Sequence, residues 1–175
     1  MRNNYAIQCQ ILKRFTIGLV LLNVFGCNQG QPAMADSALA SVSVPSVAKM
    51  NQEFIVAYSK LGRTEKKISA SYLVIPGTGC SGCITFAEQF LKDNIQSHKN
   101  LKFILTKINS VKLLKAKLGI DLRNPNLILD TLNQFGLGDL NSIYPTLYLF
   151  NQLGMLNKVS NSSDPEFDSL IRSTD

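Results

Sequence analysis

The chain has 175 residues, of which 45% are hydrophobic and 17% charged, so it is long enough for one domain with a substantial core. Its formal net charge of +6 comes partly from Arg2, Lys13 and Arg14, which precede the first acidic residue, Asp36. The other lysines are spread along predicted helices and are not interleaved with aromatic residues. This pattern is typical of solvated helix faces, so we expect no nucleic-acid partner.

An apolar segment, residues 15–26, follows the basic beginning of the chain. It is too short to cross a bilayer, and its length and flanks predict a signal peptide over residues 1–26. The segment ends in Gly26-Cys27, a small residue directly before a cysteine, which resembles the lipobox of bacterial lipoproteins. The resemblance implies cleavage before Cys27 and lipid attachment to Cys27. We therefore expect the protein to be a lipid-anchored membrane protein of the cell envelope that faces the periplasm, with the choice of inner or outer membrane open.

Residues 27–45 are small, polar and interrupted by proline, which predicts a flexible tether from the lipidated cysteine. Residues 46–175 are predicted to form a single domain. It begins with a helix, because apolar residues recur at helical spacing from Val47 to Leu61, just before Gly62.

Two cysteines three residues apart, Cys80 and Cys83, lie between a predicted strand at 68–75 and a predicted helix that continues to Ile95. If the helix starts at Cys80, the two Cβ atoms lie on one face about 5 to 6 Å apart, which a disulfide can span. The helix N-terminus favours a thiolate, so Cys80 is the predicted nucleophile and Cys83 the resolving cysteine. Strand, glycine turn, CxxC and helix together predict a redox-active pair.

Other interpretations of the pair remain open. A zinc site needs two further ligands, and His98 is one candidate. A permanent structural disulfide would suit an exported protein, although so small a loop gains little stability from a cross-link. Copper delivery with His98 as an extra ligand is disfavoured, because His98 follows Cys80 by several helical turns and is expected on the surface. We therefore expect no metal and no organic cofactor.

The elements expected after the CxxC helix alternate between strand and helix before a final hairpin and helix. In order, they are a strand at 101–108, a helix at 111–118 between the caps Ser110 and Gly119, a strand at 126–130, a helical or irregular piece toward Leu140, hairpin strands at 144–150 and 155–160, and a helix from Ser163 or Asp164.

This order, with the CSGC motif at 80–83 and the Tyr-Pro-Thr triplet at 144–146, resembles the thioredoxin fold. More narrowly, it is similar to TlpA-like membrane-tethered thioredoxins, which insert a strand and a helix before the proline. The resemblance implies an α/β fold with a mixed sheet of about five strands and helices on both faces. It also implies a cis Pro145 beside the dithiol, with Tyr144, Pro145 and Thr146 binding the extended chain of a substrate.

The sequence departs from the thioredoxin pattern in three places, one of which is Ser81-Gly82 in place of the usual Gly-Pro between the cysteines. Gly79 replaces the tryptophan that usually precedes the first cysteine, which should leave Cys80 more open. The buried carboxylate that usually takes the proton of the resolving thiol has no match in the strand at 68–75. Glu88 lies on the CxxC helix, but we expect it to point to solvent.

The resemblance implies a membrane-anchored thiol-disulfide oxidoreductase, which exchanges disulfides with envelope proteins or small thiols through Cys80 and Cys83. A membrane electron donor is implied if the protein acts as a reductant, and the direction of electron flow stays open. The alternative is a non-catalytic thioredoxin-fold binding module of a cell-envelope assembly with a static disulfide, because a fold alone does not establish activity.

Overall fold

The computed structural model describes residues 46–63 and 68–174. The predicted signal peptide, the lipidation site Cys27 and the predicted tether lie outside the described residues, so these three remain predictions. Within the described part of the chain, no helix is long and apolar enough to cross a membrane.

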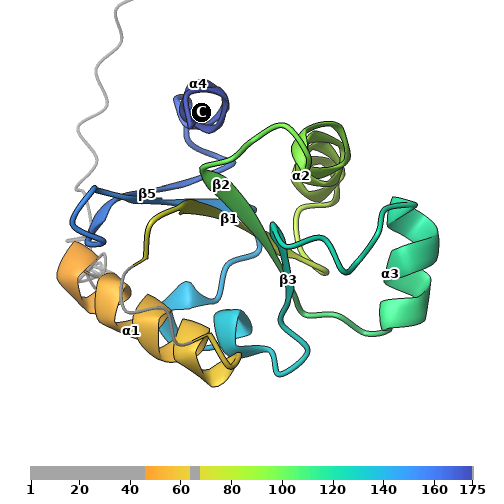
Figure 1. Ribbon diagram of the computed structural model, residues 1–175, viewed down its shortest axis with the longest axis horizontal. Coiled ribbons are helices and arrows are strands. Elements are labelled where there is room, and N and C mark those ends of the chain that lie inside the picture. The colour runs from red at the N-terminus through yellow and green to blue at the C-terminus, as the bar shows by residue number, and fades with distance from the viewer. Residues whose placement is uncertain (1–45, 64–67, 175) are drawn as a thin grey trace, which may run out of the picture. The chain divides into compact units, whose positions relative to one another are not determined.

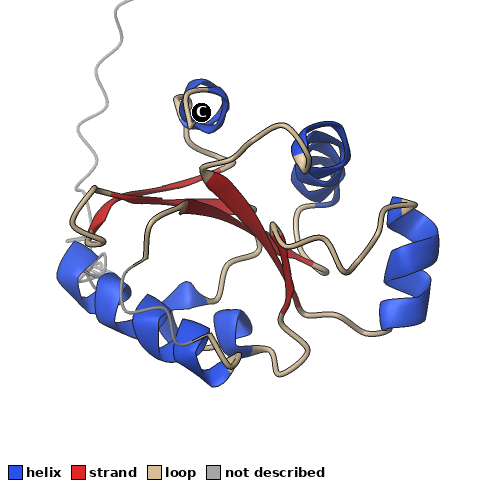
Figure 2. Cartoon of the chain, viewed as in Figure 1, coloured by secondary structure: helices blue, strands red, loops and turns tan. Residues whose placement is uncertain are grey.

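Five strands form one mixed sheet in the order β3-β2-β1-β4-β5. Figure 2 shows the sheet in red and the helices that flank it in blue. The strands are β1 (Ser71–Pro76), β2 (Leu101–Thr106), β3 (Leu127–Leu129), β4 (Thr146–Phe150) and β5 (Leu156–Asn161). Strands β1, β2 and β3 are parallel, whereas β4 is antiparallel to β1 and to β5. The C-terminal ends of β1, β2 and β3 and the N-terminal end of β4 therefore lie at the same end of the sheet.

Helices cover both faces of this sheet (Figure 1). They are α1 (Val47–Lys60), α2 (Ser81–Asn94), α3 (Val111–Leu118) and α4 (Phe167–Arg172), with the short 3-10 turns η1 (Gln134–Gly136) and η2 (Gly138–Leu140). Helices α2 and α4 lie on one face, and α1 with the two 3-10 turns lies on the other. This arrangement confirms the predicted α/β thioredoxin-like fold, with five strands and helices on both faces.

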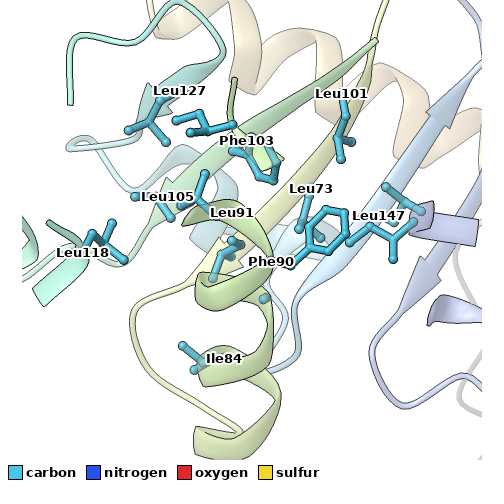
Figure 3. Close-up of a cluster of buried hydrophobic side chains, with 14 of the residues drawn as sticks. Leu73, Ile84, Phe90, Leu91, Leu101, Phe103, Leu105, Leu118, Leu127 and Leu147 are labelled. Atoms are coloured by element: carbon cyan, nitrogen blue, oxygen red, sulfur yellow. The ribbon is translucent and has the colours of Figure 1, made fainter. Parts of the chain in front are cut away.

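Alternation along the strands divides the interior into two cores, since successive side chains of a strand point to opposite faces. In β1, Leu73 and Ile75 face α2, whereas Tyr72 and Val74 face α1. The buried residues of the α2-side core are Leu73, Ile75, Ile84, Ala87, Phe90, Leu91, Ile95, Leu101, Phe103, Leu105, Leu118, Leu127, Leu147, Phe167 and Ile171, many of which are drawn in Figure 3. Those of the α1-side core are Phe54, Ala57, Tyr58, Ile68, Ala70, Tyr72, Val74, Ile104, Ile128, Phe135, Leu140, Tyr148 and Leu156.

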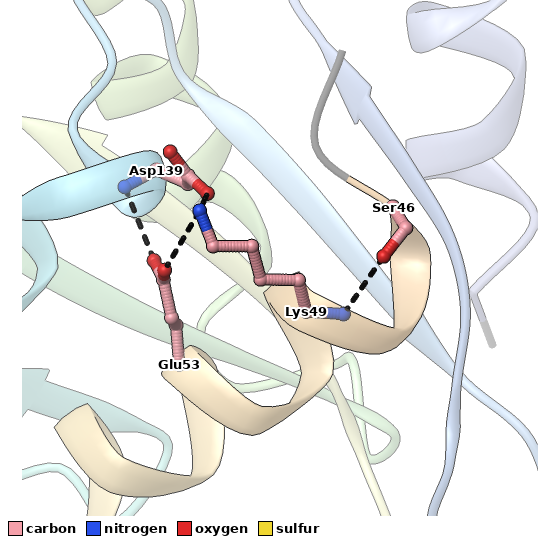
Figure 4. A network of polar contacts seen from close by, with 4 residues as sticks. All are labelled: Ser46, Lys49, Glu53 and Asp139. Atoms are coloured by element: carbon pink, nitrogen blue, oxygen red, sulfur yellow. Dashed lines mark hydrogen bonds and ion pairs between the residues drawn. The ribbon is translucent and has the colours of Figure 1, made fainter. Parts of the chain in front are cut away.

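Helix α1 is fixed to the domain by an aromatic cluster and by ion pairs. Phe54 is fully buried, and its ring centroid lies 5.0 Å from those of Phe135 and Tyr148. At the surface, Lys49 Nζ lies 2.6 Å from the Asp139 carboxylate, and the Asp139 N–H donates to Glu53 at 3.1 Å (Figure 4). The hydrogen bond that Lys49 donates to Asp139, together with the negative charge of Asp139, raises the pKa of Lys49 above its usual value.

The predicted apolar stripe of α1 is only partly buried. Met50, Phe54 and Tyr58 face the sheet as expected, but Val47 and Ile55 are 44% and 45% exposed. The reason is helical geometry: Ile55 lies about 100° around the helix from Phe54 and so leaves the face that meets β1 and β4.

Other boundaries follow local signals closely. Helix α3 begins after Ser110, whose hydroxyl accepts the Leu113 N–H, and ends at Gly119 with φ 67°. Strand β2 stops at Thr106, two residues earlier than predicted, because Lys107 turns the chain with φ 54°. The last helix starts at Phe167, after a turn that begins at Asp164.

Candidate active site

The cysteine pair lies where β1 gives way to α2. Cys80 is the N-cap residue of α2, and Cys83 lies in the first helical turn. Their sulfur atoms form a disulfide across a Cα–Cα distance of 5.4 Å. A separation of three residues at a helix start thus brings the two sulfurs together within one turn.

The pair lies at the exposed end of the helix. Both cysteines are partly buried, the neighbours Gly79, Ser81 and Gly82 are exposed, and Ile84 is buried at 5% exposure. A reagent or a partner chain can therefore approach the sulfurs from the helix end, whereas the side that faces the sheet is filled by the α2-side core.

The local electrostatics favour a negative sulfur. The side chain of Cys80 makes no capping hydrogen bond, and the first turn, residues 81–84, has no acidic residue. The unpaired N–H groups and the positive dipole end of α2 stabilise a thiolate once the disulfide is reduced. Cys80, as the N-cap residue, lies closest to them.

The loop that precedes β4 contacts the cysteine pair directly. The Cys80 N–H donates to the Ile143 carbonyl oxygen at 2.9 Å. Gly79 has φ 144°, and a Cβ at this position would collide with the same carbonyl. A residue without a side chain is therefore required before Cys80, because the backbone of the Ile143 loop occupies that space.

The predicted substrate-binding triplet follows in this loop. Tyr144 is partly buried, whereas Pro145 and Thr146 are buried. The Thr146 hydroxyl donates to the Tyr144 carbonyl at 3.0 Å, and the Pro145 carbonyl accepts the Ser162 N–H at 2.9 Å. The residue of this loop that touches Cys80 is Ile143, whose side chain is 55% exposed. A role of the triplet in substrate binding remains a prediction.

The expected cis peptide at Pro145 is wrong in this structure. The described residues contain no cis peptide bond, so the bond from Tyr144 to Pro145 is trans. Trans is the favoured isomer of such bonds by about 0.5 to 1 kcal/mol. In this conformation the carbonyls of Ile143, Tyr144 and Pro145 each accept a hydrogen bond.

Two polar residues expected on the surface are buried. Glu88 is 7% exposed, and its carboxylate accepts a hydrogen bond of 2.7 Å from Lys117 of α3. His98 is 6% exposed, with its ring centroid 5.5 Å from that of Phe90. Glu88 is buried because α3 packs beside α2 and supplies the counter-charge that a buried carboxylate needs.

The described residues show no grouping of three or more His, Cys, Asp or Glu side chains that could hold a metal ion. His98 follows the C-terminal end of α2, whereas Cys80 and Cys83 lie at its N-terminal end. The histidine and the cysteine pair therefore belong to opposite ends of the helix.

Three residues near the pair were not predicted from the sequence: Ile143, whose carbonyl accepts the Cys80 N–H, and Lys107 and Ser142, which share a hydrogen bond next to it in the chain. Lys107 Nζ donates to the Ser142 carbonyl at 3.0 Å, next to the carbonyl that binds Cys80. One signal could have revealed Lys107. It directly follows a parallel strand, and the carboxyl ends of such strands gather at one edge, where sites form.

No family model matches the chain, and no curated protein matches it. Similar solved structures include a thioredoxin candidate from Neisseria meningitidis, which is 19% identical over 59% of this chain and 71% of that chain, with a TM-score of 0.40. A peroxiredoxin-like protein from Aquifex aeolicus is 10% identical over 61% of this chain and 71% of that chain, with a TM-score of 0.38. An exposed lipoprotein thioredoxin from Streptococcus pneumoniae is 19% identical over 61% of this chain and 84% of that chain, with a TM-score of 0.37.

The fold assignment rests on the order of the elements and on the strand order of the sheet. In this thioredoxin-like fold, the chain carries a disulfide-bonded CxxC pair at a helix N-terminus with exposed neighbours. These features support a redox enzyme in general terms.

Proposed function

We propose that the protein is a membrane-anchored thiol-disulfide oxidoreductase of the TlpA-like kind, which faces the periplasm and acts through Cys80 and Cys83. The observation that carries the proposal is the disulfide at the exposed N-terminus of α2, held against the Ile143 carbonyl. Its substrates are disulfides of envelope proteins or of small thiols, and the reaction needs no cofactor.

The reductive direction starts from the dithiol. The Cys80 thiolate attacks one sulfur of the substrate disulfide, so that a mixed disulfide forms, the substrate bond breaks, and the departing thiolate takes a proton from water. The Cys83 thiol then loses its proton to water and attacks Cys80 Sγ. The Cys80–Cys83 bond forms, the second substrate thiolate leaves and is protonated, and two electrons have passed to the substrate. The oxidised pair seen here runs the same steps in reverse with a substrate dithiol.

The loop at 142–146 supports the binding of a substrate chain beside the pair. It approaches Cys80 through the Ile143 backbone, and the Ile143 side chain is exposed next to it. An extended peptide that lies along this loop would place its own disulfide near Cys80 Sγ. Tyr144, Pro145 and Thr146 continue the same loop into β4 and would fix its position.

The membrane anchor is the second part of the proposal and rests on the sequence around Cys27. Lipid at this cysteine would hold the domain, which begins with α1, near the bilayer through the tether at 28–45. A membrane electron donor is then within reach of the pair. Mass spectrometry of the mature protein should find lipid on Cys27, and the Cys27→Ser variant should lack it. Absence of lipid from the parent protein would contradict lipidation at this residue.

Trapping of a mixed disulfide tests the catalytic part. Cys83→Ser leaves Cys80 able to attack and removes the thiol that resolves the intermediate, so partners should accumulate as disulfide-linked adducts in cells. Cys80→Ser is the matched control and should trap few or none. If neither variant traps a partner, and if the reduction potential lies below about −300 mV, the disulfide is structural and the protein is a binding module of an envelope assembly.

A further inference from the structure

Lys107 has a backbone conformation that lysine rarely adopts. Its φ of 54° is in the left-handed region, where residues other than glycine, asparagine and aspartate are uncommon. The other described non-glycine residue with positive φ is Asn133, a residue type that tolerates this region. Strained backbone of this kind gathers at functional sites, so the contacts of the Lys107 side chain can have a functional role.

The loop that contains Lys107 contacts the segment that leads to Cys80. The Gly77 N–H donates to the Thr106 carbonyl at 2.8 Å, and a Cβ at Gly77 would collide with the Lys107 carbonyl. The loop after β2 and the loop that leads to Cys80 are therefore in direct backbone contact. Lys107 therefore lies in a loop that contacts the residues just before the CxxC motif.

The Lys107 side chain reaches the third loop of the site. Its ammonium donates to the Ser142 carbonyl at 3.0 Å, and the next carbonyl along, that of Ile143, accepts the Cys80 N–H at 2.9 Å. Lys107 and Cys80 thus hold neighbouring residues of one loop. Lys107 is partly buried, so solvent screens its charge less than it screens a fully exposed lysine.

Other charged groups near this edge already have partners. Glu88 of α2 is paired with Lys117 of α3. The Asp130 carboxylate, which follows β3, is fully buried and accepts hydrogen bonds from the Thr106 hydroxyl and from the backbone N–H groups of residues 134 and 135. The segments at 77–83 and 141–146 contain no charged residue, and their one titratable group besides the cysteines is the Tyr144 phenol.

We infer that Lys107 is a positioning residue for the dithiol: its ammonium fixes the Ser142–Ile143 segment against Cys80 and favours the Cys80 thiolate when the disulfide is reduced. The inference rests on the proposed function. An ammonium group has three donors, and within residues 46–63 and 68–174 the Ser142 carbonyl is the one acceptor recorded for Lys107. A positive charge on the loop that holds Cys80 favours the charged form of the thiol.

The test compares three variants in the full chain carrying Cys9→Ser and Cys27→Ser, so that Cys80 and Cys83 are its thiols. Lys107→Met removes the charge and the hydrogen bond, Lys107→Arg keeps both, and Lys112→Met removes an exposed lysine of α3 as the matched control. The reduced proteins are alkylated with iodoacetamide from pH 5 to 10, and each is equilibrated with glutathione redox buffers.

Lys107→Met should raise the apparent thiol pKa and slow alkylation below this pKa by about three- to tenfold. It should also shift the glutathione equilibrium toward the disulfide, because the reduced form loses its stabilising charge. Lys107→Arg should stay within about twofold of the parent, and Lys112→Met should match it.

An unchanged pH profile of alkylation in Lys107→Met, even with a lower melting temperature, would overturn the inference. Lys107 would then have a structural role only. A failure of Lys107→Arg to restore the profile would overturn the inference as well. If Lys107→Met does not fold, Lys107→Gln, which keeps a donor without the charge, decides in the same way. The alkylation profile needs no substrate, so its outcome is independent of whether Cys83→Ser traps a partner.

Discussion

The two faces of the sheet are built from different side chains and carry different tasks. The α2-side core is mostly leucine and isoleucine, and the cysteine pair lies at the end of its main helix. The α1-side core is centred on an aromatic cluster around Phe54, and α1 is also tied down by the Lys49–Asp139 ion pair. Damage to the α1-side core is therefore expected to lower stability without changing thiol reactivity, because the helix that carries the cysteine pair packs on the other face.

The largest expected loss of stability follows from removing the aromatic ring at the centre of the α1-side core. Phe54→Ala should lower the free energy of unfolding by about 3 to 5 kcal/mol, since Phe54 is fully buried among aromatic rings. The next residue, Ile55, is 45% exposed, so Ile55→Ala should cost less than about 1 kcal/mol. Chemical denaturation measures both. The alkylation rate of the folded, reduced protein should not change in either variant, and a clear change in Phe54→Ala would break the separation of the two faces.

On the other face of the sheet, we expect a smaller loss of stability but a direct change in the reactivity of the thiols. Ile84→Ala should cost about 2 to 5 kcal/mol, because Ile84 is 5% exposed in the α2-side core. Ile84 also follows Cys83 and donates its N–H to the Cys80 carbonyl, so a loosened first turn should change the alkylation rate. Gln89→Ala, on the exposed side of α2, is the control and should alter neither quantity. An unchanged alkylation rate in Ile84→Ala would show that the pair does not depend on the core beneath it.

The smallest effect appears only in alkali. Burial, and to a lesser degree the Glu53 carboxylate, raise the pKa of Tyr148 above its ordinary value of 10.0. The unfolded chain therefore ionises first, and stability that is fully present below pH 10 is lost as the pH rises above it. Tyr148→Phe should spare about 1 kcal/mol of this loss between pH 10 and 11. Urea denaturation at both pH values measures it, with Tyr144→Phe as the control. Parallel losses in the parent and in Tyr148→Phe would contradict the assignment.

The sequence predicts the elements whose signals are local. Ser110 and Gly119 mark both ends of α3, and the Asn151–Gly154 turn separates the strands of the hairpin. The spacing of Cys80 and Cys83 at a helix start likewise predicts that their sulfurs can meet.

Features that depend on contacts distant in the chain were not predictable. Glu88 is buried only because Lys117, 29 residues later, comes to lie beside it. Lys107 lies 35 residues before its acceptor on Ser142, so its place after a strand could suggest a site residue but could not predict this contact. Pro145 was expected to be cis by family resemblance, and the hydrogen bonds of its own loop accompany the trans form instead.

Gly79 has a consequence for the surface around Cys80. The Ile143 carbonyl oxygen occupies the space that a Cβ at residue 79 would need. The indole that resembling proteins place before the first cysteine and the Cys80-to-Ile143 hydrogen bond are thus mutually exclusive in this backbone. The exposed side chain beside Cys80 is instead that of Ile143, an aliphatic group that offers shape but no hydrogen bond.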